Sequence, residues 1–122
     1  MSKNTADEAR VTITLQVFSG RPNPSWQLTA QDAESLLQML DQARRSGARR
    51  QSCSAPDLGY RGLTVRVAAG ADIKDWRVFD GCLQQDNKHL EDGGRRIEAF
   101  VLRTMPNPLK TELAPLLPHI GN

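Results

Sequence analysis

The sequence contains no hydrophobic run that approaches the length of a membrane-spanning helix. Its first ten residues, MSKNTADEAR, are polar and lack the apolar segment of a signal peptide. We therefore expect a cytoplasmic protein that does not associate with membranes. Because the cytosol keeps thiols reduced, the two cysteines, Cys53 and Cys82, are not expected to form a disulfide.

Aromatic residues and net charge are also scarce. Phe, Trp and Tyr make up 5% of the 122 residues, which predicts a core poor in aromatic side chains. A thin core favours a homodimer, because small domains often gain stability from a partner. Sixteen basic residues stand against fourteen acidic ones, and the net charge of +2 lacks the excess that is typical of nucleic-acid-binding proteins.

One basic cluster still allows a nucleic-acid accessory protein as a further hypothesis. No aromatic residue is interleaved with this cluster, so stacking on a single strand is not indicated. Termination of a helix explains the cluster more simply, since cations suit a helix carboxyl end. Nucleic acid is therefore a disfavoured partner. The cluster consists of Arg44, Arg45, Arg49 and Arg50.

Patterns that identify common enzymes and metal sites are missing as well. The cysteines form no Cys-x-x-Cys pair, and there is no Gly-x-Ser-x-Gly nucleophile motif. Cys82 and His89 are near in sequence, but they lack the spacing of a known catalytic pair. Cys53, Cys82, His89 and His119 match no zinc-ligand spacing. We therefore predict no catalytic residues, no metal site and no cofactor.

Acidic residues that could perform acid–base catalysis have simpler structural roles. Asp80 belongs to a predicted turn, and Glu91 to a solvated loop. Asp92 is placed to cap a helix, and Glu98 is expected on the outer face of that helix. A small cofactor-free enzyme, with acid and base residues from separate segments, stays open as the alternative to a non-catalytic protein.

Three segments of the first half carry clear periodicities. Residues 11–17 and 63–67 alternate between apolar and polar, so both are predicted to be half-buried strands. The stretch LTAQDAESLLQMLDQARRSG, residues 28–47, predicts a helix that Thr29 caps. Its apolar stripe consists of Ala33, Leu36, Leu37, Leu40 and Ala43.

The second half is less clear. In WRVFDGCLQQ, Asp80-Gly81 favours a two-residue hairpin turn, although one strand with a bulge at Gly81 is also open. QDNKHLEDGG is expected to be a loop, and RRIEAFVLRTM a second helix with Asp92 as its cap. Gly93-Gly94 could present free N–H groups to an anion, but a hinge is the preferred interpretation.

These elements predict one α+β domain over residues 11–122, after a flexible leader at residues 1–10. The simplest arrangement is an antiparallel or mixed sheet of three to four strands. Two main helices would pack on one face of this sheet.

The loop VFSGRPNPSW, residues 17–26, is the best candidate for a functional site. Pro22 and Pro24 fix the backbone and favour extended conformations for Arg21 and Asn23. As a plain connection, the loop would carry Trp26 into the core. As a recognition surface, Arg21 would bind a carboxylate or phosphate, and Trp26 would offer a stacking face.

We therefore expect a non-catalytic binding or accessory module more than an enzyme. Its expected binding residues are Arg21, Asn23 and Trp26, held on a loop that a scaffold makes rigid. The expected partner is a peptide, a protein or a small anionic ligand.

Overall fold

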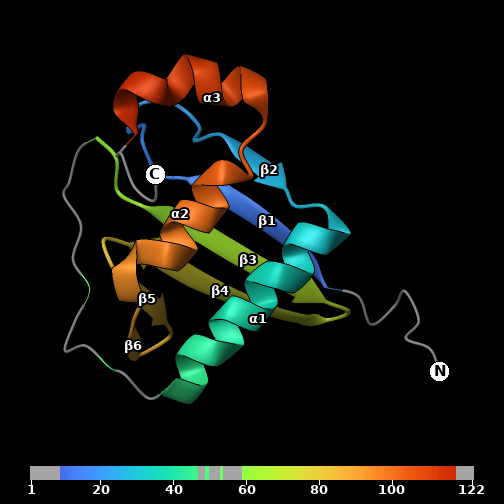
Figure 1. Cartoon of the computed structure of the whole chain (residues 1–122). Helices are drawn as coiled ribbons and strands as arrows, with labels where there is room; N and C mark the ends of the chain where they lie inside the picture. The colour runs from blue at the N-terminus through green and yellow to red at the C-terminus, as the bar shows by residue number, and fades with distance from the viewer. Residues whose placement is uncertain (1–8, 47–48, 50–52, 54–58, 118–122) are drawn as a thin grey trace.

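The computed structural model describes residues 9–46, 49, 53 and 59–117 (Figure 1). Six strands form one open sheet in the order β2-β1-β3-β4-β5-β6, and all neighbours are antiparallel. The class is α+β as expected, but the predicted number of three to four strands is wrong. The strands are β1 (Arg10–Leu15), β2 (Ser25–Gln27), β3 (Leu63–Ala69), β4 (Asp72–Phe79), β5 (Cys82–Gln85) and β6 (Lys88–Glu91).

The two additional strands are short and carry weak sequence signals. β2 has only three residues, and Trp26 lies opposite Ile13 of β1. β6 lies in the polar stretch that we predicted to be a loop. Leu90 is its only buried residue, so the sequence shows no clear alternation there. Leu90 lies opposite Leu83 of β5, and the two-residue connection between Gln85 and Lys88 agrees with this register.

The helices cover one face of the sheet (Figure 1). Both α1 (Ala30–Ser46) and α2 (Arg96–Arg103) lie across the strands, and α3 (Asn107–Leu113) follows α2. Short 3₁₀ turns, η2 (Gly93–Arg95) and η3 (Ala114–Leu116), precede α2 and follow α3. Thr29 caps α1 as predicted, since its hydroxyl accepts from the Asp32 N–H at 3.1 Å. None of the described helices has the length and apolar character needed to cross a membrane.

The hairpin at Asp80-Gly81 is confirmed. Phe79 at the end of β4 lies opposite Cys82 at the start of β5, so two residues connect the strands. Asp80 and Gly81 have φ values of +50° and +82°, as a type I′ turn requires at both central positions.

The core lies between the helices and the covered face of the sheet. Alternate residues of the central strands point toward the helices, and their burial removes apolar surface from water. The opposite face is more polar, as is common in antiparallel sheets with one solvated side. The core strand residues include Val11, Ile13, Leu15, Leu63, Val65, Trp76, Val78, Leu83 and Leu90, which meet Ala33, Leu36, Leu40, Ile97 and Val101 of the helices.

A disulfide joins Cys53 to Cys82, which corrects the expectation of two reduced thiols. That expectation came from the inferred compartment, and the sequence gives no sign that β5 brings Cys82 beside Cys53. Arg49 also forms a β-bridge with Leu90, on the side of β6 away from β5. Arg49 and Cys53 are therefore both attached to the β5–β6 end of the sheet. The expected leader falls mainly on residues 1–8, which lie outside the described residues.

Candidate functional site

The 17–26 loop is fastened by the side chain of Asn23. Its Oδ1 accepts hydrogen bonds from the N–H groups of Val17, at 3.0 Å, and Phe18, at 2.7 Å. Its Nδ2 donates to Gln16 Oε1 at 2.9 Å. Gln16 Nε2 in turn donates to Thr64 Oγ1 of β3 at 3.1 Å. Asn23 therefore holds the two ends of the loop together, and its amide is already in use.

Backbone hydrogen bonds also fix the base of the loop. The Leu15 N–H donates to the Pro24 carbonyl at 3.0 Å, which extends the pairing of β1 with β2. On the other side, the Gln16 backbone N–H donates to the Gly62 carbonyl at 2.9 Å. The Gln16 backbone carbonyl accepts from the Arg61 N–H at 2.7 Å. The loop thus projects from a base that is held by strands on both sides.

Trp26 is part of the core. Its side chain packs in the main apolar cluster, and the residue is only 8% exposed. The indole Nε1 donates to Thr104 Oγ1 at 2.9 Å, so its one polar atom is satisfied by the end of α2. In this structure the ring has no free face for a ligand, and Trp26 acts by anchoring β2 to the helices.

Arg21 is the expected site residue that remains accessible. It is exposed at the projecting end of the loop, and its guanidinium carbon lies 3.9 Å from the centre of the Phe18 ring. This distance is typical of a cation–π contact. No ion pair joins Arg21 to an acidic residue of the described chain. Nearby, Arg61 Nη2 donates to the Phe18 carbonyl at 2.7 Å, which places a second arginine at this end of the sheet.

Glu98 is fully buried, which corrects its expected position on the outer face of α2. Its carboxylate accepts from the Arg95 guanidinium, the Tyr60 hydroxyl and the Asp80 N–H. The helical pattern could not reveal this, because the hydrogen-bond donors come from a distant loop and from the hairpin turn. Every polar partner of Glu98 is structural, so the carboxylate joins α2 to the sheet.

The Asp92 side chain caps the amino end of α2, as the sequence predicted, although Arg95 occupies the N-cap position itself. Its Oδ1 accepts from the Ile97 N–H at 2.9 Å, and its Oδ2 accepts from the Glu98 N–H at 3.1 Å. Burial raises the pKa of the Asp92 carboxyl above its ordinary value, although the two backbone hydrogen bonds oppose this shift. Because Asp92 fills the amino end of α2, the arrangement gives no support to anion binding after Gly93-Gly94.

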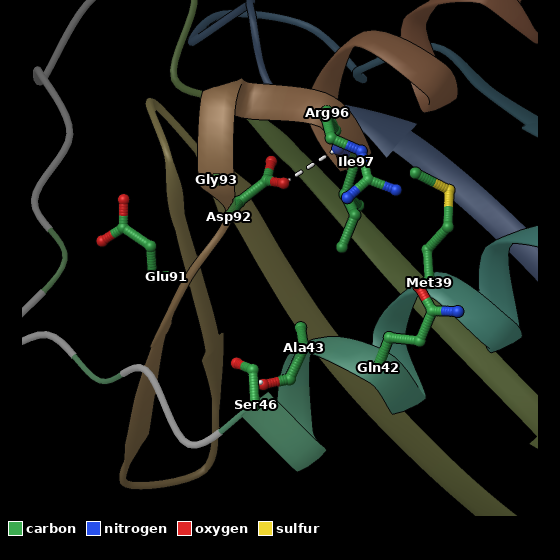
Figure 2. Close-up of a pocket in the computed structure, with 9 residues that line it drawn as sticks. All are labelled: Met39, Gln42, Ala43, Ser46, Glu91, Asp92, Gly93, Arg96 and Ile97. Atoms are coloured by element: carbon green, nitrogen blue, oxygen red, sulfur yellow. Dashed lines mark hydrogen bonds between the residues drawn. The ribbon is translucent and has the colours of Figure 1, made fainter.

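A hollow of about 240 Å³ separates the carboxyl half of α1 from the start of α2 (Figure 2). Figure 2 shows the Arg96 side chain extending across this hollow toward α1, whereas Glu91 points away from it. The Asp92 carboxylate is turned toward the Ile97 N–H and is occupied there. The hollow therefore contains an exposed cation but lacks an available acid–base pair.

A second hollow, of about 280 Å³, lies between α1 and the β3–β5 part of the sheet. Its charged groups are compensated. Arg44 pairs with Asp41 at 2.7 Å, and Lys74 lies 3.7 Å from Asp72. Arg45 also pairs with Asp41, so two arginines at the end of α1 share one carboxylate and both are engaged in ion pairs. Arg50, the last member of the expected cluster, lies outside the described residues.

The remaining candidates for chemistry are dispersed. Cys82 is in the disulfide and therefore has no thiol to act as a nucleophile. His89 is on β6, and His119 lies outside the described residues. Within the described ranges, no three His, Cys, Asp or Glu side chains form a group that could hold a metal ion.

Comparison with protein-family models, curated proteins and solved structures finds no match to this chain. The case for a function therefore rests on the geometry of the described side chains. Among them, Arg21 combines an exposed charge with a fixed position, and Asn23 and Trp26 supply that position.

Proposed function

We propose that this chain is a non-catalytic binding module, in which Arg21 recognises a carboxylate or another anionic group of a partner. The observation that carries the proposal is the exposed Arg21 guanidinium, stacked on Phe18 and without an acidic partner among the described residues. The Arg61 side chain also braces this loop, because its Nη2 donates to the Phe18 carbonyl. The partner classes are those that carry such groups, namely a peptide, a protein or a small anionic ligand.

The stacked arrangement suits the recognition of an anion. An arginine that lies over an aromatic ring uses its flat face, and the N–H donors at its edge remain available for a bidentate contact. Because Phe18 already orders the side chain, less conformational entropy is lost when a ligand binds. The contact with Phe18 therefore serves the binding of a carboxylate or phosphate better than a freely rotating arginine would.

Asn23 and Trp26 act as positioning residues in this proposal. Asn23 holds the backbone of Phe18, and Phe18 supports Arg21. Trp26 fixes the strand that follows the loop. Neither residue needs to touch the partner, so their substitution would weaken binding through loss of loop order.

The test is affinity capture from a native lysate with three purified baits of matching thermal stability. These are the wild-type protein, Arg21→Ala, and Arg103→Ala, which removes an exposed arginine at the end of α2. Mass spectrometry of retained proteins and small molecules should find a component that Arg21→Ala loses and Arg103→Ala keeps. Identical sets from wild type and Arg21→Ala would overturn the proposal.

The compartment remains a prediction. The polar start of the sequence led us to expect the cytoplasm. The Cys53–Cys82 disulfide is a type of bond that is more common in oxidising compartments. We therefore keep the cytoplasm as a proposal that depends on the redox state of these two cysteines in the cell.

A further inference from the structure

The two edges of the sheet differ. β6 forms one edge, and the β-bridge between Arg49 and Leu90 already lies along its outer side. β2 forms the opposite edge (Figure 1), and no described residue pairs with its outer side. An open edge presents backbone groups that can bond to another strand.

The register shows which groups of β2 face outward. The Pro24 carbonyl accepts from the Leu15 N–H, and the Leu28 N–H donates to the Val11 carbonyl. In an antiparallel pair, alternate residues bond to the same neighbour. Pro24, Trp26 and Leu28 therefore face β1, whereas the backbone N–H and carbonyl groups of Ser25 and Gln27 point to the open side.

We propose that this edge pairs with β2 of a second copy of the chain, antiparallel and about a two-fold axis at Trp26. Ser25 of each copy then lies opposite Gln27 of the other. Each of these pairs exchanges two backbone hydrogen bonds, because outward-facing residues form the hydrogen-bonded positions of the ladder. The two sheets become continuous through an interface in which both copies use the same surface.

The charges beside β2 favour a second copy over an unrelated strand. Arg21 lies five residues before Trp26, and Asp32 lies six residues after it. Antiparallel pairing brings the Arg21 end of one copy toward the Asp32 end of the other, at two equivalent places. No ion pair involves either side chain within the described chain.

The opposite edge of the sheet differs from β2, because another segment of the same chain already pairs with it. The Arg49 bridge meets β6 at Leu90, so β2 is the edge strand with no pairing on its outer side among the described residues. This inference rests on the proposed function, because it identifies the second copy as a partner whose carboxylate Arg21 binds.

The test is sedimentation equilibrium of the purified protein from low micromolar to near-millimolar concentration. Gln27→Pro removes the outward N–H while leaving the hydrogen bonds to β1, and Gln27→Ala keeps that N–H. Wild type and Gln27→Ala should form a reversible dimer, and Gln27→Pro should stay monomeric with a similar circular dichroism spectrum. A wild-type protein that is monomeric throughout, or a dimer that Gln27→Pro retains, would overturn the inference.

Charge reversal supplies a second, independent measurement. Arg21→Asp and Asp32→Arg should each weaken the dimer by about tenfold, and the double variant should recover it, because opposite charges are restored. Absence of recovery would contradict the proposed pairing of charges. A monomeric wild type with Arg21-dependent capture from lysate would refute the dimer alone. If Arg21→Ala changes neither the dissociation constant of the dimer nor the set of components captured from lysate, the proposed function is refuted.

Discussion

The guanidinium of Arg95 and the carboxylate of Glu98 face each other through two hydrogen bonds. The Nε–Oε1 distance is 2.9 Å, and the Nη2–Oε2 distance is 3.0 Å. Glu98 is fully buried, whereas Arg95 reaches the surface and also lies 3.5 Å from Asp80. The pair connects the start of α2 with the β4–β5 hairpin. Together with Tyr60, it fixes the helical layer against the sheet that carries the loop.

Arg95→Met should therefore destabilise the protein strongly. The substitution keeps an unbranched side chain but leaves the Glu98 carboxylate buried without its cation. Loss of one partner of a buried pair costs about 3 kcal/mol in unfolding free energy. Urea denaturation measures this loss, and Arg103→Met, at an exposed position of the same helix, serves as control. Equal stability of the two variants would show that the pair contributes little.

The phenol of Tyr60 should remain protonated in the folded protein at alkaline pH. Burial, followed by the hydrogen bond to Glu98, raises the pKa of Tyr60 far above its ordinary value. An unfolded chain ionises tyrosine at about pH 10, so the stability from this group is complete below that pH and decreases above it. Tyr60 is the sole tyrosine, so tyrosinate absorbance reports on it alone. The signal should appear together with unfolding; ionisation in a folded protein near pH 10 would contradict this prediction.

The contribution of Asp92 to stability should grow in acid, whereas that of a typical ion-paired carboxylate decreases. Because burial raises the pKa of Asp92, the folded state takes up the proton first as pH decreases. Its contribution to stability is therefore complete below the unfolded value of about 3.9 and is lost as pH rises through the folded pKa. The stability difference between wild type and Asp92→Asn should widen on acidification. Urea denaturation at neutral and acidic pH tests this, and a constant difference would count against it.

Much of the fold could be predicted from the sequence where one periodicity extends over several residues. The alternation over residues 11–17 predicted β1, which spans Arg10–Leu15, and the helical repeat after Thr29 predicted α1. β2 and β6 are too short for this, and their positions depend on pairing with distant strands. The sequence indicated a rigid loop at Arg21, but it could not show that Trp26 is buried against Thr104, because the two are far apart along the chain.

Gly62 lies so close to β4 that a side chain at this position should not fit. A Cβ at this position would lie 2.4 Å from the Val78 carbonyl oxygen, and Gly62 has a φ of +94°. Gly62→Ala should therefore lower the unfolding free energy by more than about 2 kcal/mol, through steric overlap and backbone strain. Gly20→Ala is the matched control, since its Cβ would meet no other described part of the chain within 4 Å. Thermal unfolding of both variants decides; similar melting temperatures would argue against this close contact.

The Cys53–Cys82 disulfide should make a measurable contribution to stability. The bond connects residues 29 positions apart, and a cross-link of that length removes about 3 to 4 kcal/mol of chain entropy from the unfolded state. The unfolding free energy of the wild type should decrease by this amount in reductant. That of Cys53→Ser should be low and should not change when reductant is added. Intact-mass measurement before and after reduction shows whether two hydrogens are gained. If protein isolated under thiol-blocking conditions carries two blocked cysteines, the bond is absent in the cell, and the original expectation of reduced thiols is restored.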